Sequence, residues 1–156
     1  MKEYKIIIPE ENYSIFEYNR DDLPAIMVLN TALLKFKPKE VFSWHLSLII
    51  NFKTLNNNGM PTESETELST PFEENIDEQL KGIDKDKPNA LFVARITWNG
   101  TRELIYRIYN PEITNTVLEN IINNKIFPRE FEYKIEFDKK WSLNKWQLKQ
   151  IKRNNL

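Results

Sequence analysis

Apolar and polar residues alternate along four segments in the second two-thirds of the chain. The longest example begins at Trp44, from which apolar side chains recur at every second position up to Phe52. A period of two is typical of a strand that buries one face, because successive side chains point to opposite sides of a sheet. The pattern predicts strands over residues 44–53, 90–98, 101–109 and 131–137.

The second and third of these strands are joined by Asn99-Gly100. This pair predicts a tight β-hairpin, because both turn positions need a positive φ that asparagine and glycine adopt readily. Strict alternation places Arg95 and Arg107 on one face of the hairpin, away from the predicted helices. The apolar side chains expected on the opposite face of the first hairpin strand are Phe92, Ala94, Ile96 and Trp98.

Two segments have the spacing of amphipathic helices. Because proline is tolerated only in a first turn, Pro71 predicts a helix over residues 71–81 that is capped by Thr70 and ends at Gly82. A second helix is expected to begin at Pro111, after the cap residue Asn110. The expected buried stripes are Leu68, Phe72, Ile76 and Leu80 in the first case, and Ile113, Val117, Leu118, Ile121 and Ile122 in the second.

Shorter apolar runs predict further elements at the two ends of the chain. Residues 4–8, 14–18 and 25–30 are expected to form strands of an N-terminal β-meander within residues 1–40. After the last strand, Ser142 is expected to cap a C-terminal helix that extends through about Arg153, within residues 141–156.

The order of elements between residues 44 and 137 is strand, helix, strand, strand, helix, strand. This βαββαβ order predicts an α+β protein with a ferredoxin-like sandwich, and right-handed crossovers place both helices on one face of its sheet. We therefore expect a single domain over residues 1–156, with the meander, a βαββαβ core over 44–137 and the terminal helix. The other face of the sheet is expected to be open.

The composition argues against several kinds of chemistry. The 22 basic and 23 acidic residues give a net charge of −1, which argues against a nucleic-acid partner. The chain has no cysteine, and its one histidine, His45, cannot form an imidazole cluster for a metal. With three glycines, the sequence contains no glycine-rich phosphate loop. We expect no cofactor, no metal, no membrane segment and a cytoplasmic location.

The polar face of the hairpin is the candidate ligand site. Arg95, Glu103, Arg107 and Tyr109 would meet there, because the two hairpin strands are neighbours. Arginine binds carboxylates and phosphates through paired hydrogen bonds, although a cross-strand arginine–glutamate pair without a ligand is the alternative. His45 lies on the face opposite the Trp44 stripe, either as a general base oriented by a glutamate or as a histidine that only hydrogen-bonds a neighbour.

The hairpin sequence from Leu91 to Glu103, followed by Tyr106 and Tyr109, resembles the central block of a bacterial domain-of-unknown-function family, family six-nine-five. That block combines an apolar run ending in Ala-Arg-Ile-Thr, a turn glycine and an Arg-Glu pair. The segment from Trp141 is similar to the family's closing segment. The resemblance covers most of the chain and implies a fold rather than catalytic residues. The family is distantly like the ribonuclease E inhibitor B group, which implies a regulatory binding role.

We therefore expect a non-enzymatic binding or regulatory protein that acts through its open sheet face and terminal helix. The expected partner is another protein, because acidic residues gather within residues 63–78 and basic residues within 139–153. The chain is expected to be a monomer or a homodimer. One alternative is a regulator of RNA metabolism that binds a nuclease. Another is a small-molecule-binding or hydrolytic protein that uses Arg95, Arg107 and His45.

Overall fold

The computed structural model describes residues 4–153, so the ends of the expected meander and terminal helix (residues 1–3 and 154–156) lie outside the described residues. The strands are β1 (Tyr13–Arg20), β2 (Leu23–Asn30), β3 (Trp44–Asn51), β4 (Ala90–Trp98), β5 (Thr101–Ile108) and β6 (Phe131–Phe137). The helices are α1 (Glu63–Lys81), α2 (Pro111–Asn123) and α3 (Lys145–Arg153), and the 3-10 helices are η1 (Thr31–Lys35), η2 (Lys39–Phe42) and η3 (Ser142–Asn144).

The six strands form one antiparallel sheet in the order β1-β2-β4-β5-β3-β6. The expectation of an α+β protein is confirmed, as is the hairpin of β4 and β5, in which Asn99 and Gly100 have φ values of 44° and 76°. The first expected strand is wrong, because residues 4–12 form no strand. Instead, the buried Tyr4 packs edge-on against Phe42, and its hydroxyl donates to the carbonyl of Pro88 at 2.6 Å.

The first helix begins well before Pro71, contrary to the expected start at that residue. The side chain of Thr62 accepts a hydrogen bond from the backbone N–H of Glu65 and so caps a helix that continues through the proline. Proline removes only one backbone donor, and the rest of the helix is retained because its buried face packs on the sheet. Leu68 is 42% exposed and does not belong to that face. The expected end at Gly82 is confirmed, with φ of 86°.

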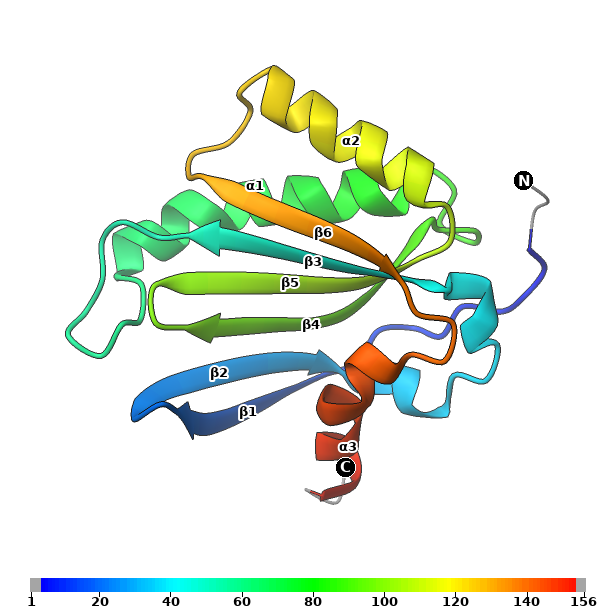
Figure 1. The fold of residues 1–156 in the computed structure, drawn as a ribbon, viewed down its shortest axis with the longest axis horizontal. Helices are drawn as coiled ribbons and strands as arrows, with labels where there is room; N and C mark the ends of the chain where they lie inside the picture. Colours follow the sequence, from blue (N-terminus) through cyan, green and yellow to red (C-terminus); the bar gives the residue numbers. More distant parts are fainter. Residues whose placement is uncertain (1–3, 154–156) are drawn as a thin grey trace.

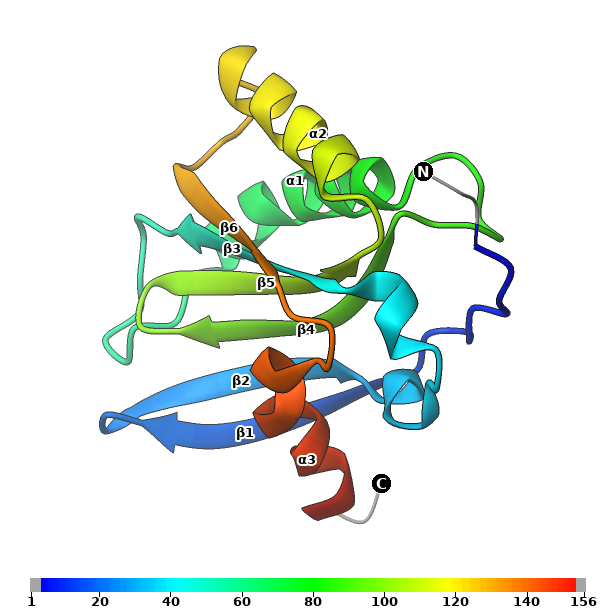
Figure 2. The same cartoon turned by 45° about the vertical axis from the view of Figure 1, so that its right-hand side comes forward.

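The sheet carries two hydrophobic cores on opposite faces. On one face, which we call the α1 side, α1 and α2 pack over β3, β5 and β6 and over the start of β4. On the other face, the α3 side, the N-terminal segment, η1, η2 and α3 pack over β2, β4 and β5. Figures 1 and 2 show that the β1–β2 hairpin extends beyond α1 and α2, while α3 lies across it. Among the described helices, none has the length and hydropathy needed to span a membrane.

Acid is expected to weaken the contact between α1 and the connection that leads into β6. Arg129 donates to both carboxylate oxygens of the buried Glu65, at 2.5–3.2 Å, and the backbone N–H of Lys53 adds a bond of 3.3 Å. The hydrogen bonds from Arg129 lower the pKa of Glu65 below its ordinary value of 4.5, although burial opposes them. This contribution to stability is therefore complete above about pH 4.5 and is lost as the pH falls through the lowered pKa.

Urea unfolding at neutral pH and at several acidic pH values measures this loss. Glu65→Gln is the control, because the amide does not titrate. The variant is expected to be less stable at neutral pH and to lose less stability on acidification than the parent protein. Equal losses in the two proteins would contradict the assignment of this titration to Glu65.

Candidate functional site

The structure places Arg95 and Arg107 on opposite faces of the sheet, so the expectation of one polar patch is wrong. The cause is a β-bulge between Phe92 and Ala94, which shifts the register of β4 against β5. An extra residue in one strand reverses the face that every following side chain occupies. Arg95 therefore lies on the α1 side, where its Nη1 is 3.7 Å from Oε1 of Glu73 in α1.

Arg107 lies on the α3 side, away from α1 and α2 as expected, but it is completely buried. Its Nη1 donates to Oδ2 of Asp138 and Oδ1 of Asn144 at 3.0 and 2.9 Å, and its Nε donates to the carbonyl of Phe42 at 3.3 Å. The guanidinium also lies 4.8 Å from the ring centre of Trp141. Burial lowers the pKa of Arg107 to about 10 although Asp138 opposes this, so Arg107 stays charged and anchors η3 from inside.

The other predicted site residues also lie on the α3 side, but they form no open surface. His45 is only 6% exposed, and burial and the neighbouring guanidinium of β5 lower its pKa, so the imidazole is neutral near pH 7. Glu103 accepts a hydrogen bond from the hydroxyl of Ser47 at 2.5 Å. Tyr109 packs edge-on against Tyr4, with 4.9 Å between ring centres. These contacts are typical of side chains in or beside a hydrophobic core, and they do not form a ligand site.

The sheet face that was expected to be open is covered over its central strands. The N-terminal segment, η1, η2 and α3 bury the apolar side chains there, including Trp141. Arg95, Arg107 and His45 cannot act on one substrate, because the sheet separates the first from the other two and the other two are enclosed. The site therefore has to be sought on the α1 side, where Arg95 lies.

Two adjoining cavities lie on the α1 side, and we call them together the α1 groove; Arg95 lines the smaller of them. A cavity of about 470 Å³ lies between α1 and the strands β2, β4 and β5. A second of about 970 Å³ lies between the C-terminal end of α1, the start of β4 and residues 8–11. Both are within or near the size range of ligand sites, roughly 300–1,000 Å³. Asp77, Glu78 and Phe92 line both cavities.

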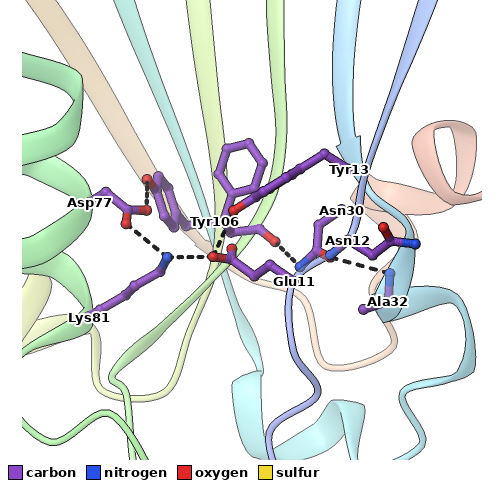
Figure 3. Close-up of polar contacts among 9 residues, drawn as sticks. Glu11, Asn12, Tyr13, Asn30, Ala32, Asp77, Lys81 and Tyr106 are labelled. Atoms are coloured by element: carbon purple, nitrogen blue, oxygen red, sulfur yellow. Dashed lines mark hydrogen bonds and ion pairs between the residues drawn. The ribbon is translucent and has the colours of Figure 1, made fainter. Parts of the chain in front are cut away.

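A chain of hydrogen bonds crosses the junction of the two cavities (Figure 3). Lys81 lies between two carboxylates and donates to Asp77 at 2.8 Å and to Glu11 at 3.0 Å. Asp77 also accepts from the hydroxyl of Tyr106 at 2.7 Å, and Glu11 accepts from the hydroxyl of Tyr13 at 2.8 Å. These hydrogen bonds connect α1, β5, the first residue of β1 and the segment before it across the junction of the two cavities.

Lys81, Tyr106 and Tyr13 keep their protons at neutral pH. Burial would lower the pKa of Lys81, but Asp77 and Glu11 outweigh it and raise the pKa. Burial, followed by the charge of Asp77, raises the pKa of Tyr106 well above its ordinary value, so the phenol remains a donor. Burial and Glu11 likewise raise the pKa of Tyr13. None of these shifts brings a group toward titration near pH 7, as a general acid or base needs.

Arg95 is the least satisfied polar side chain of the groove floor. Glu73 pairs more closely with Arg102, at 3.0 Å, than with Arg95, and it also accepts from Ser69 at 2.7 Å. The Arg95 side chain is 40% exposed, and its Nε has no hydrogen-bond partner among the residues that the structure describes. Burial lowers the pKa of Arg95, with Arg102 adding to the effect. Because the Nε atom is itself buried, a partner with acceptor atoms would contact the exposed part of the Arg95 side chain.

The floor of the groove continues onto apolar side chains of the β1–β2 hairpin. In the sheet register, Arg95 lies opposite Val28, and Val28 lies opposite Ile15. Ile15 is 69% exposed, and Val28 and Ile26 are half-buried. We call Tyr13, Ile15, Ile26 and Val28 the hairpin patch.

The other part of the sheet that lacks covering helices has a different character. On the α3 side, the outer strand β6 presents Glu132, Lys134 and Glu136, which are the polar side chains expected of a surface in contact with water. An uncovered face of a sheet is normally polar, whereas contiguous exposed apolar side chains mark sites of interaction. The hairpin patch is therefore a candidate binding surface.

Sequence reasoning missed most of the groove. Its members come from residues 8–13, 28–33, 73–92 and 95–106 and from Val117 of α2, which only the folded sheet brings together. The spacing of Asp77 and Lys81, four residues apart on a helix, is the one local signal for a contact among them. Within the described part of the chain, no group of three histidine or acidic side chains could hold a metal ion. What the arrangement offers chemically is shape, apolar area and charge.

The fold and the groove define the chain as an α+β protein with a cavity between a helix and an antiparallel sheet. It belongs to the family of unknown function DUF695, whose model matches residues 11–145, and the resemblance predicted from the hairpin is thereby confirmed. Comparison with curated proteins and with solved structures finds no match. The bacterial origin and the distant likeness to the ribonuclease E inhibitor B group stay predictions.

Proposed function

We propose that this chain is a non-enzymatic binding protein and that a segment of another protein occupies the α1 groove. The observation that carries the proposal is the hairpin patch, where apolar side chains remain exposed directly beside the cavities. Burying such side chains in a complex gains about 25 cal/mol for each Å² of apolar surface removed from water. This surface replaces the open sheet face as the expected binding surface.

The polar network of the groove supports a role in binding rather than in catalysis. Lys81, Asp77 and Tyr106 already have hydrogen-bond partners, and those partners hold the groove in shape without a ligand. A preformed site does not spend binding energy on ordering its own side chains. The groove is therefore suited to hold a partner in one orientation.

A ferredoxin-like core forms part of the same proposal. The order β4-β5-β3-β6 within the larger sheet, with α1 and α2 on one face, supports this topology. The β1–β2 hairpin then adds two strands beside β4 and creates the floor that the partner uses. A cytoplasmic location, the binding of a nuclease and the choice between monomer and homodimer stay predictions.

Selection from a random peptide library displayed on phage tests the proposed function. The full chain is immobilised, and enriched peptides are synthesised and titrated by fluorescence polarisation. Replacing Ile15 by glutamate places a charge in the hairpin patch and is expected to weaken their binding at least about tenfold, or 1.4 kcal/mol. Because Ile15 is 69% exposed, the substitution is expected to change the free energy of unfolding by no more than about 0.5 kcal/mol.

Ile126→Glu is the matched control, because Ile126 is also an exposed isoleucine, at 55%, and lines neither cavity. It is expected to leave peptide affinity unchanged. Peptides that bind Ile15→Glu as tightly as the parent protein, or that lose binding with Ile126→Glu instead, would refute the groove as the binding site.

A further inference from the structure

We infer that the partner segment is a basic amphipathic α-helix, which lies alongside α1 and over the β1–β2 hairpin. This inference rests on the proposed function and adds the conformation and charge of the partner. Three features of the α1 side carry it: the width of the uncovered sheet, the distribution of apolar side chains on it, and the charge of the neighbouring helix.

The width of the uncovered sheet fits one helix. α1 packs against β4, and β2 and β1 follow as the next two strands of the sheet. Strands are about 4.8 Å apart, so β1 lies about 10 Å from β4. Packed helices have axes about 8–10 Å apart and diameters of about 10–12 Å. A helix placed next to α1 would therefore lie over β2 and β1, in the layer that α1 and α2 already begin (Figures 1 and 2).

The apolar side chains of the hairpin patch are distributed as a helix would need them. Ile15 and Val28 are directly opposite each other on neighbouring strands, and Ile26 is the next residue of β2 on the same side. An amphipathic helix buries a stripe of residues spaced three and four apart, which covers two strands rather than one. An extended segment would instead have to pair with the edge of β1 and would leave the patch exposed.

The charge of the groove selects a basic partner. Its two cavities are lined by six acidic and three basic side chains. The basic ones are Lys81, Lys85 and Arg95, and two of them already pair with acidic residues of the groove. Glu10, Glu74 and Glu78 form no ion pair with any residue in the described part of the chain, and all three carboxylates are available to a cationic partner.

Arg95 fits the same occupant. Its guanidinium lies at the floor of the groove and its side chain is 40% exposed, so the exposed part of the side chain can donate to a polar side chain or to a terminal carbonyl of the bound helix. The acidic side chains line the α1 wall above it, so a lysine or arginine on the flank of the bound helix would contact that wall. Complementary charge of this kind fixes orientation and speeds association.

Synthetic helices test the inference directly. The probe is a fluorescein-labelled, end-capped peptide of about four helical turns, with leucine in one stripe and lysine and alanine elsewhere. A second peptide carries glutamate in place of every lysine, and a third has two central alanines replaced by proline, which prevents a helix. Fluorescence polarisation measures affinity, and circular dichroism measures helix gained on mixing.

The lysine peptide is expected to bind, to gain helix and to lose affinity as salt is raised. The double substitution Glu74→Lys and Glu78→Lys is expected to weaken it about tenfold. The control is Glu130→Lys with Glu132→Lys, which makes the same change in net charge beside the distant edge strand β6 and is expected to leave affinity unchanged. Both pairs of residues are exposed, so folding is retained.

Three results would overturn the inference: equal binding of the glutamate peptide, equal binding of the proline peptide, or no binding of the lysine peptide to the groove. In each case the phage-selected peptides and Ile15→Glu still decide the proposed function separately. Conversion of a dimer into a monomer by Ile15→Glu would also overturn the inference, because a second copy of this chain would then be the occupant.

Discussion

Replacing Arg107 by methionine is expected to lower the free energy of unfolding by about 3–5 kcal/mol. The guanidinium is completely buried and is hydrogen-bonded to Asp138, Asn144 and the carbonyl of Phe42. Methionine fills much of the volume but leaves these buried acceptors without their donor, and an unpaired buried acceptor retains its full desolvation cost. Urea unfolding followed by circular dichroism measures the change.

Two companion variants separate charge from geometry. Arg107→Lys keeps the positive charge but cannot reach several acceptors at once, so it is expected to recover only part of the loss. Asp138→Asn removes the negative charge and replaces one acceptor oxygen by an N–H donor, whereas both carboxylate oxygens of Asp138 accept from backbone N–H groups at Ser142 and Leu143. It is therefore expected to lower the free energy of unfolding as well. If Arg107→Met were as stable as the parent protein, Arg107 would not be the anchor that attaches η3 to the sheet.

Replacing Glu73 by alanine is expected to lower the free energy of unfolding by about 3 kcal/mol. Glu73 and Arg102 are a buried pair, with side chains 9% and 8% exposed, and the carboxylate also faces Arg95. Removing it leaves two neighbouring guanidinium groups without their shared anion. The same urea measurement applies, and peptide binding by this variant reports on the position of Arg95.

The double variant Glu73→Ala with Arg102→Met is the control. The double variant lacks Glu73 and also lacks the buried positive charge of Arg102, which Glu73→Ala alone leaves without its carboxylate. It is therefore expected to be more stable than Glu73→Ala alone. A double variant that is less stable by the full sum of the two single losses would show that the charge pair is not what stabilises this part of α1.

Several elements could be predicted from the sequence because their causes are local. Asn99-Gly100 determines the hairpin of β4 and β5, since both residues adopt positive φ. Asn110 and Pro111 determine the start of α2, where the asparagine side chain accepts from the backbone N–H of Glu112 at 3.0 Å. In each case two adjacent residues are sufficient, and no distant contact is needed to select the conformation.

The start of α1 could not be predicted from local rules, because packing outweighs them. Pro71 disfavours a continuous helix at this position. The buried face of α1, including Phe72, Ile76 and Leu80, nevertheless packs against the sheet, and Thr62 supplies a cap that lies well upstream. The stability of a helix in a protein comes mainly from such packing rather than from propensity.

The position of Arg95 depends on a single extra residue in β4. The run from Leu91 to Ala94 is apolar at four successive positions, and this departure from alternation was the available signal of the bulge. If strict alternation is assumed, every side chain after the bulge is assigned to the wrong face of the sheet. Strict alternation therefore places Arg95 on the α3 side, so the α1 groove could not be predicted from the sequence.

The order of strands in the sheet also affects how the chain can fold while the ribosome synthesises it. β3 lies between β5 and β6, and both of these strands follow it in the sequence. The register partners of His45, which are Arg107 and Glu136, are therefore synthesised well after it. At a synthesis rate of about 5–20 residues per second, both edges of β3 lack their partner strands for several seconds, and its apolar side chains are exposed during that time. We therefore expect chaperones to bind incomplete chains that contain β3 but lack β5 and β6. We expect the full-length chain to fold slowly, on the order of milliseconds to seconds.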